Sequence, residues 1–353
     1  VIMAGGSGTR FLPLSRKDKP KKFLKLGSEE KTLIQMAASR LEKIVGKNNI
    51  LVVTAQSQVA LVQEQLPHAV ILAEPCAKNT APCLAMAGHY IQARVGDVPM
   101  ICVPADHYIG KEQGLLDLFN QAVELVKNED TLCTIGISPT YPETGYGYIK
   151  SKSSNPDLVA TVDCFVEKPT IDKAISYIES NQYFWNSGMF IWRSSVLLDQ
   201  IKKFLPKIDQ TINEIISRIE DVSAYDTLTE MFSSIDPVSI DFGVMEKAPS
   251  IKMLIGSKFT WSDIGSWHSW SDCFADESLN SYVNPIVSNE EVVIVDSQNC
   301  AVYGNNKCIA LVGLKDIIIV DTDKALLLCD KKSSQKVKEV VEILKEKNRL
   351  DLL

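Results

Sequence analysis

The residues best suited to chemistry begin with a glycine-rich run directly after a short apolar stretch: Ala4, Gly5, Gly6, Ser7, Gly8, Thr9 and Arg10. Glycines let a backbone approach a phosphate closely, and successive N–H groups can cradle its oxygens. Arginine binds phosphate oxygens in pairs, and Lys21 and Lys22 follow as mobile positive charges. The pattern predicts a triphosphate site, although a ligand-free turn and a solvated charge run stay open as alternatives.

Two familiar nucleotide motifs are excluded by the same run. It contains no Gly-Lys-Ser or Gly-Lys-Thr, so it is not a Walker A loop. The third glycine of a dinucleotide-binding fingerprint would fall on Phe11. A nicotinamide-dependent dehydrogenase is therefore disfavoured, and cofactor titration would test it.

Two aspartates are candidates for metal binding. Asp106 follows an apolar run, 100–104, that predicts a buried strand, and ligands gather at such strand ends in open α/β sheets. Asp263 lies between Trp261 and Trp267 in a turn that contains glycine. Carboxylates can bind Mg²⁺, a hard ion that prefers oxygen ligands and substrate phosphates. Taken alone, each aspartate could equally be a helix cap or a turn former.

The elements that must position these residues alternate along the first part of the chain. Apolar runs predict buried strands at 1–4, 50–54, 69–72, 100–104 and 131–137. Helical periodicity predicts helices at 32–45, 58–65, 80–94 and 111–127. Alternation implies right-handed crossovers and an α/β fold with a Rossmann-like, mixed but mainly parallel sheet. The region 140–275 is more irregular and is expected to complete a pocket.

The C-terminal part has a different sequence pattern, with short apolar runs that repeat. The segment 292–296 is echoed by 317–321, which suggests stacked β-coils of a short β-helix. A terminal amphipathic helix is expected, with Ser333 or Ser334 as its cap and with Val337, Val340, Val341 and Leu344 on one apolar face. We expect a nucleotidyltransferase domain at 1–279 and a β-helix-like domain at 280–353.

Seven motifs, in order, resemble those of the sugar-1-phosphate nucleotidyltransferases. They are the glycine-rich run with Lys21 and Lys22, and the segments around Glu74, Asp106, Gly145, Glu167, Asn186 and Asp263. Several are similar to the branch that transfers guanylyl groups to mannose 1-phosphate. The resemblance covers residues 1–267, and the C-terminal β-coils resemble the family's C-terminal domain.

The resemblance implies a role for each segment. Arg10, Lys21 and Asp106 would be catalytic, with Mg²⁺ bound by Asp106 and Asp263. The nucleotide would contact residues 4–9 together with Glu74, Pro75, Asn79 and Thr80. The sugar phosphate would contact Glu143, Gly145, Tyr146, Gly147, Glu167, Lys168, Asn186, Ser187 and Gly188. Strand packing for Tyr146 and a surface ion pair for Glu167 and Lys168 remain alternatives.

The base is inferred from Glu74. Guanine presents its N1–H and exocyclic amine side by side, and a carboxylate can accept both, whereas glutamine would suit uracil or thymine better. Glu74 favours guanine, and the resemblance to the mannose 1-phosphate branch implies a reaction that joins GTP and mannose 1-phosphate. Uridylyl, thymidylyl or adenylyl transfer to glucose 1-phosphate and a catalytically silent nucleotide-sugar-binding subunit stay open.

Composition indicates which partners and which cellular compartment to expect. The net charge of −7 argues against a nucleic-acid or anionic-membrane partner, and no apolar stretch approaches the roughly 20 residues that span a bilayer. Nine cysteines, an odd number, predict reduced thiols in a cytoplasmic protein. The apolar β-coils and terminal helix favour a homodimer.

Overall fold

The computed structural model describes residues 1–6, 11–27, 30–154, 156–221, 223, 225–274, 283–288, 291–304 and 307–353. The chain divides into two compact units. Unit 1 comprises Val1–Gly5, Ala37–Ala105 and Lys111–Trp261, and unit 2 comprises Gly6–Met36, Asp106–Gly110 and Ser262–Leu353. The expected boundary between residues 279 and 280 falls outside the described residues and stays a prediction.

Unit 1 is built on a nine-stranded sheet with the order β3-β2-β1-β4-β9-β6-β10-β8-β7. Its first half contains the predicted strands β1 (Ile2–Ala4), β2 (Leu51–Ala55), β3 (Val70–Glu74) and β4 (Pro99–Pro104), all parallel. Strand β3 is less buried than predicted, because it forms the edge of the sheet and leaves Val70 exposed.

The second half of the sheet contains β6 (Leu132–Ile137), β7 (Tyr148–Ser151), β8 (Val159–Val166), β9 (Tyr183–Arg193) and β10 (Ile251–Gly256). Strand β9 runs antiparallel to β4, β6 and β7, while β10 is parallel to β6. The expected mixed α/β sheet is confirmed. It is less parallel than its N-terminal half suggested, because β9 inserts antiparallel at its centre.

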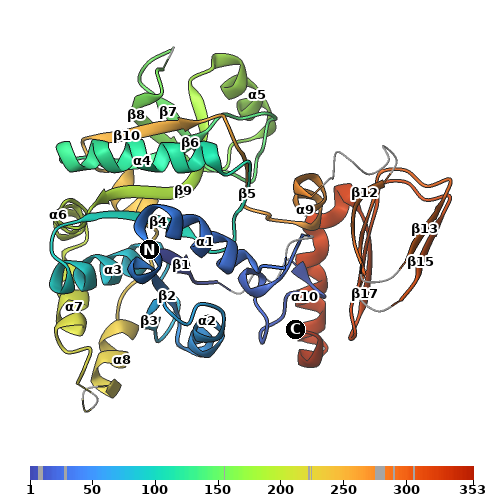
Figure 1. The fold of residues 1–353 in the computed structure, drawn as a ribbon, viewed down its shortest axis with the longest axis horizontal. Coiled ribbons are helices and arrows are strands. Elements are labelled where there is room, and N and C mark those ends of the chain that lie inside the picture. The colour runs from blue at the N-terminus through green and yellow to red at the C-terminus, as the bar shows by residue number, and fades with distance from the viewer. Residues whose placement is uncertain are drawn as a thin grey trace. The chain divides into compact units, whose positions relative to one another are not determined.

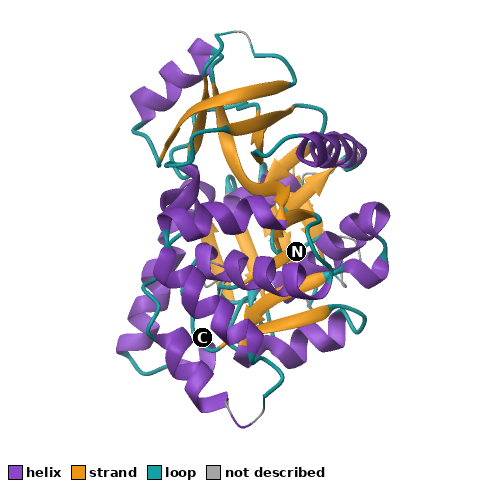
Figure 2. Cartoon of the chain, turned by 90° about the vertical axis from the view of Figure 1, so that its left-hand side faces the viewer, coloured by secondary structure: helices purple, strands orange, loops and turns teal. Residues whose placement is uncertain are grey.

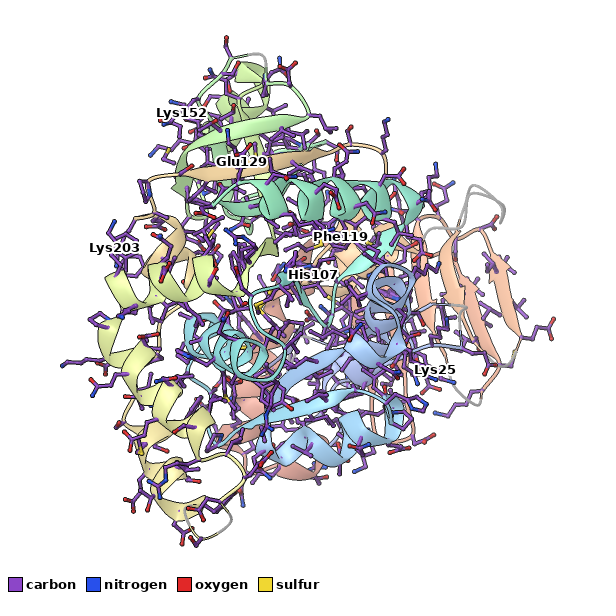
Figure 3. The ribbon with its side chains drawn as sticks, turned by 60° about the vertical axis from the view of Figure 1, so that its left-hand side comes forward. Lys25, His107, Phe119, Glu129, Lys152 and Lys203 are labelled. Carbon is purple, nitrogen blue, oxygen red and sulfur yellow. The ribbon has the colours of Figure 1, made fainter. Side chains whose placement is uncertain are left out.

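Helices cover both sides of this sheet, as Figure 2 shows. They are α1 (Leu33–Val45), α2 (Val59–Gln65), α3 (Thr80–Arg94), α4 (Gln113–Asn128), α5 (Ile171–Ser180), α6 (Ser194–Phe204), α7 (Pro206–Ser217) and α8 (Tyr225–Ser233). Helix α4 runs along β9, β6 and β10 (Figure 1). Its Phe119 is fully buried, whereas Lys152 and Lys203 lie at the periphery of unit 1 (Figure 3). Among the described residues, no helix is both long and apolar enough to cross a membrane.

The strands of unit 2 form the expected β-coils. Strands β12 (Val283–Val287), β14 (Cys300–Tyr303), β16 (Ile317–Asp321) and β17 (Leu326–Asp330) form one sheet, and β13 (Val292–Val295) pairs with β15 (Ile309–Val312). Register partners such as Val292 and Ile309, or Ala301 and Ile318, are 17 residues apart. The predicted echo between 292–296 and 317–321 is therefore not the structural repeat, because β13 and β16 belong to different sheets.

Unit 2 also contains a 3-10 helix at Lys21–Phe23, β5 (Tyr108–Gly110), α9 (Trp267–Cys273) and α10 (Val337–Glu346), and β11 (Thr260–Ser262) ends at its border. The predicted serine cap of the terminal helix is wrong. A 3-10 helix, Lys331–Lys336, precedes α10, and the Asp330 side chain caps it by accepting from Lys332 N. Val337 and Val341 are buried as expected, but Val340 is 40% exposed.

Unit 2 has its own hydrophobic core, which packs residues from distant parts of the sequence. Phe11 and Leu24 lie in one cluster with Trp267, Ile318 and Val337. The indole nitrogens of Trp267 and Trp270 donate hydrogen bonds to the carbonyl oxygens of Leu12 and Leu26. The segment that carries Lys21 and Lys22 is thereby anchored at both ends.

Candidate active site

The glycine-rich run leaves strand β1 as predicted. Ala4 is fully buried and its carbonyl accepts a hydrogen bond from Thr54 Oγ1, while Gly5 and Gly6 are exposed. Gly6 has φ +77°, which other L-residues adopt at a cost, and an added Cβ there would meet open space. The requirement at Gly6 is therefore conformational. Ser7, Gly8, Thr9 and Arg10 lie outside the described residues, so their roles stay predictions.

In unit 2, Lys21 joins the two predicted metal ligands. Its ammonium donates to Asp106 Oδ2 at 2.9 Å and to the backbone oxygen of Asp263 at 2.5 Å. Asp106 follows β4, and Asp263 follows β11. Lys21 and Asp106 thus form a charge cluster that also contacts the Asp263 backbone, and the catalytic and metal-binding roles of these residues stay predictions.

Both lysines of this segment are buried, so they are not a solvated charge run. Lys21 is 5% exposed and Lys22 is 3% exposed. Lys22 Nζ donates to the carbonyl oxygen of Gly6 at 2.8 Å, which ties the charge cluster to the glycine-rich run. Burial lowers the pKa of Lys22 to about 8, and the Asp106 charge opposes that shift. The predicted site residues did not include Lys22, although its place beside Lys21 was a usable signal.

Asp106 is held ionised. Burial alone would raise its pKa, but the Lys21 ammonium, followed by His107 and Lys22, brings the pKa down to about 2. Its side chain is still 39% exposed, so a carboxylate oxygen can be reached by a ligand. At neutral pH this position therefore presents a permanent, accessible negative charge.

The donors of this cluster fit a divalent cation that substrate also ligates. No group of three or more His, Cys, Asp or Glu side chains that could hold a metal occurs in the described part of the chain. The predicted ligands Asp106 and Asp263 would supply two carboxylates, and phosphate oxygens the rest, an arrangement that suits Mg²⁺. Gly265 leaves room for the Asp263 side chain, because a Cβ on residue 265 would lie only 2.9 Å from Asp263 Oδ2.

In unit 1, Glu74 ends strand β3, and one of its carboxylate oxygens has no hydrogen-bond partner among the described residues. The residue is 5% exposed, and its buried Oε1 accepts no hydrogen bond from any described residue. Burial raises the pKa of Glu74 to about 7. Because an unsatisfied buried acceptor is costly, this geometry suits a group that a ligand completes.

The segment after Glu74 leads through Pro75 into helix α3. Asn79 has φ +71°, and its side-chain oxygen accepts a hydrogen bond from Thr80 N, which caps the helix. Thr80 Oγ1 accepts from Ile240 N at 2.8 Å. These bonds fix the backbone of the predicted base segment.

The predicted sugar segment between β6 and β7 is organised by Glu143. Its Oε1 accepts from Gly145 N at 2.7 Å, and its carbonyl oxygen accepts from the Tyr148 hydroxyl at 2.8 Å. A Cβ at Gly145 would lie 3.0 Å from that carboxylate. The Tyr146 ring packs edge-on against Trp185 and Trp261, so the packing role considered for Tyr146 is also filled.

Glu167, Gly147 and Asn186 meet nearby in the same unit. Asn186 N donates to the carbonyl oxygen of Gly147 at 2.8 Å, and a Cβ on Gly147 would lie 3.2 Å from Glu167 Oε2. Glu167 also pairs with Lys168 at 2.8 Å, with both side chains largely exposed. The surface ion pair considered for these two residues therefore exists, and it leaves both charges accessible.

The motif Asn186-Ser187-Gly188 lies within β9 and divides into two roles. Gly188 has φ +64° and donates its N–H to Asn186 Oδ1. Ser187 is 1% exposed, and its hydroxyl donates to Ile135 O and accepts from Met189 N. The Ser187 hydroxyl is thus used inside the sheet, and the sugar contact expected for Ser187 stays a prediction.

Asp241 is a residue of this neighbourhood that the sequence analysis missed. It begins a π-helix, Asp241–Met245, and its Oδ1 accepts from Asn186 Nδ2 at 2.8 Å. No spacing or composition signal singles it out among the many acidic residues of the chain. Only the fold brings it to Asn186.

The chain matches known protein families over most of its length. A model of the nucleotidyl transferase family matches residues 1–278, and a model of the mannoseP isomerase/GMP-like beta-helix domain matches residues 290–344. Mannose-1-phosphate guanylyltransferase of Salmonella muenchen is 37% identical over 359 residues, which cover 99% of this chain and 74% of that protein. Alginate biosynthesis protein AlgA of Pseudomonas fluorescens is 37% identical over 358 residues, which cover 99% and 72%.

Solved structures are similar as well. The crystal structure of a mannose-1-phosphate geranyltransferase from Thermus thermophilus matches with a TM-score of 0.86 at 29% identity, over 98% of both chains. The similarity therefore includes the β-coils of unit 2 and the sheet of unit 1. It confirms the expected fold class, with a C-terminal β-helix domain and a terminal helix.

Proposed function

This chain belongs to the nucleotidyl transferase family, and we propose that it forms GDP-mannose and diphosphate from GTP and mannose 1-phosphate. The observation that carries the choice of base is the buried Glu74 carboxylate, whose Oε1 has no hydrogen-bond partner in the described part of the chain. Guanine offers two adjacent donors to such a group, whereas uracil and thymine also need a donor from the protein.

The proposed chemistry needs no protein nucleophile. A phosphate oxygen of mannose 1-phosphate attacks the α-phosphorus of GTP, a new P–O bond forms, and the bond to the β-phosphate breaks to release diphosphate. The substrate phosphate is already ionised, so the protein contributes position and charge. Lys21 is held near the reacting phosphates by its bonds to Asp106 and Asp263. Arg10 is proposed to bind the triphosphate.

Asp106 and Asp263 are proposed to hold Mg²⁺ together with the substrate phosphates. The bound ion would neutralise charge that develops on the phosphate oxygens. The pKa of Asp106, about 2, supports this assignment, because a metal ligand must be deprotonated at working pH.

The hexose and its phosphate are assigned to the second set of residues. The Glu143 and Glu167 carboxylates can accept from sugar hydroxyls, and Lys168 can pair with the sugar phosphate. The backbone at Gly145 and Gly147 allows a ring to approach closely. Support comes from the contacts that place Gly147, Glu167 and Asn186 together.

The test is diphosphate release with Mg²⁺, measured across four nucleoside triphosphates and both mannose and glucose 1-phosphate. Release only with GTP and mannose 1-phosphate supports the proposal. Release with another pair keeps the mechanism and discards the proposed base or sugar. Folded protein that releases no diphosphate with any pair would indicate a silent nucleotide-sugar-binding subunit.

We further propose that the protein is a homodimer. The β-coils expose apolar side chains on three strands: Val293, Ile294, Val295, Val312, Leu326 and Leu328. Exposed apolar patches of this kind often mark protein interfaces. A monomer mass that stays constant with concentration in light scattering would contradict the dimer.

A further inference from the structure

Asp241 is tied to both substrate segments of unit 1. Its Oδ1 accepts from Asn186 Nδ2 at 2.8 Å, on the sugar side. The preceding residue, Ile240, donates its N–H to Thr80 Oγ1 at 2.8 Å, and Val238 exchanges backbone hydrogen bonds with Lys78 and Ala81. The segment 238–241 therefore lies against the predicted base segment and delivers one carboxylate to the sugar segment.

The bond from Asn186 to Asp241 fixes which way the amide points. Gly188 N can only donate, so the atom of Asn186 that faces it at 3.0 Å must be the amide oxygen. The amide nitrogen then faces Asp241, which accepts as a carboxylate. One of the two N–H groups is used in this bond, and no described residue is shown to accept from the second.

An ionised carboxylate at Asp241 is energetically unfavourable in this surrounding. Burial raises the pKa of Asp241; the bond from Asn186 opposes that effect, and the Glu167 charge adds to it. Glu246 shares this environment: burial raises its pKa, and the Asp241 and Glu167 charges add to that shift. The described contacts thus gather carboxylates beside Gly147 and Asn186, where hydroxyl donors of a ligand would relieve their repulsion.

From these contacts we propose that Asp241 is a positioning residue of the sugar-phosphate pocket, which orients the Asn186 amide so that its second N–H meets a hexose hydroxyl. The inference rests on the proposed function, because it takes the segment of Asn186 as the sugar site. Asp241 acts through Asn186 and not on the reacting phosphates. Its loss should weaken binding of the sugar phosphate and leave GTP binding nearly unchanged.

The experiment compares Asp241→Ala, Asp241→Asn and Asp236→Ala in the full chain. Asp236 is an exposed acidic residue five positions before Asp241 and serves as the matched control. Asp241→Ala should raise KM for mannose 1-phosphate by roughly tenfold, the effect of one lost hydrogen bond to a charged group, with KM for GTP within about twofold. Asp241→Asn keeps an acceptor and should restore most of the affinity, and Asp236→Ala should match the wild type.

The outcomes separate this inference from the proposed function. A wild-type protein that makes no GDP-mannose defeats the proposed function itself. An active wild type with an unchanged KM for mannose 1-phosphate in Asp241→Ala, or with both KM values raised equally, overturns the role of Asp241. If Asp241→Ala does not fold, Asn186→Ala must raise KM for mannose 1-phosphate by a similar factor, and Asp241→Asn must not; either failure overturns the proposal.

Discussion

Glu74 and Asp106 occupy equivalent places in the sequence pattern, yet their environments are opposite. Each follows or ends a parallel strand, Glu74 on β3 and Asp106 after β4. The pKa of Asp106 is lowered to about 2 because its neighbouring cations outweigh burial, whereas burial alone raises the pKa of Glu74 to about 7. One carboxylate is balanced within the protein, and the other lacks any described partner for its buried oxygen.

The difference indicates two kinds of ligand. A carboxylate that is ionised at all working pH values suits a cation, and the lysines beside it suit phosphate oxygens. A buried carboxylate with an unsatisfied oxygen suits a neutral ligand that brings N–H donors. The two pKa values thus support a phosphate-handling cluster and a base-reading position as separate functions.

The largest expected effect comes from removing Lys21, the hydrogen-bond and charge partner of the Asp106 carboxylate. Lys21→Ala removes the ammonium that bonds to Asp106 and Asp263, so turnover should fall by about 10²–10³-fold, the usual cost of losing one group that stabilises transition-state charge. The exposed Lys19 supplies the control, since Lys19→Ala should leave kcat unchanged. Steady-state diphosphate release measures both. Near-normal turnover in folded Lys21→Ala would remove this lysine from the mechanism.

The next effect concerns Glu74, whose Oε1 accepts no hydrogen bond within the described part of the chain. Glu74→Gln replaces one of two acceptors with a donor, so kcat/KM for GTP should fall roughly ten- to hundredfold, while UTP should be used relatively better. Glu64→Gln on helix α2 is exposed and should change neither value. The assay is kcat/KM for all four triphosphates. An unaltered preference for GTP would mean that backbone groups read the base.

The sequence predicts where Glu74 and Asp106 lie relative to strands, but not the side chains that surround each carboxylate. The strands that precede or contain Glu74 and precede Asp106 were predicted from local apolar runs, 69–72 and 100–104, because hydrophobic periodicity is a local property. The partner of Asp106 is 85 residues away in the sequence, and that of Asn186 is 55 residues away. Such pairs depend on sheet order, and the antiparallel insertion of β9 that creates this order has no local signal.

The C-terminal strands show the same limit in another form. Apolar runs predicted β13 and β16 correctly as strands, but similarity between the two runs did not reveal the register. The true spacing of 17 residues pairs Val292 with Ile309 and Ala301 with Ile318. Apolar strands resemble one another whether or not they pair, so composition alone cannot assign partners.

A smaller effect should appear in the pH dependence of GTP binding. The Glu74 carboxylate accepts guanine donors only when ionised, and its pKa in the free protein is about 7. Affinity for GTP should therefore fall as the pH drops below about 7, by up to about tenfold per unit, while Asp106 stays ionised. Calorimetry from pH 5.5 to 8.5 in buffers of different ionisation enthalpy should also detect proton release on binding. A wild-type profile identical to that of Glu74→Gln would contradict the assignment.

The smallest effect is on stability and has a definite sign. Because the pKa of Glu74 rises from 4.5 to about 7 on folding, its ionised form costs stability above pH 7, and this cost vanishes below about pH 4.5. Glu74→Gln, which cannot ionise, should therefore melt about 2–4 °C higher than the wild type at pH 8, with the difference shrinking as the pH falls. Any packing cost of the buried amide is independent of pH, so the slope of the difference is the decisive quantity. A difference that stays constant from pH 4.5 to 8 would show that Glu74 is ionised with a partner in the free protein, and its contrast with Asp106 would disappear.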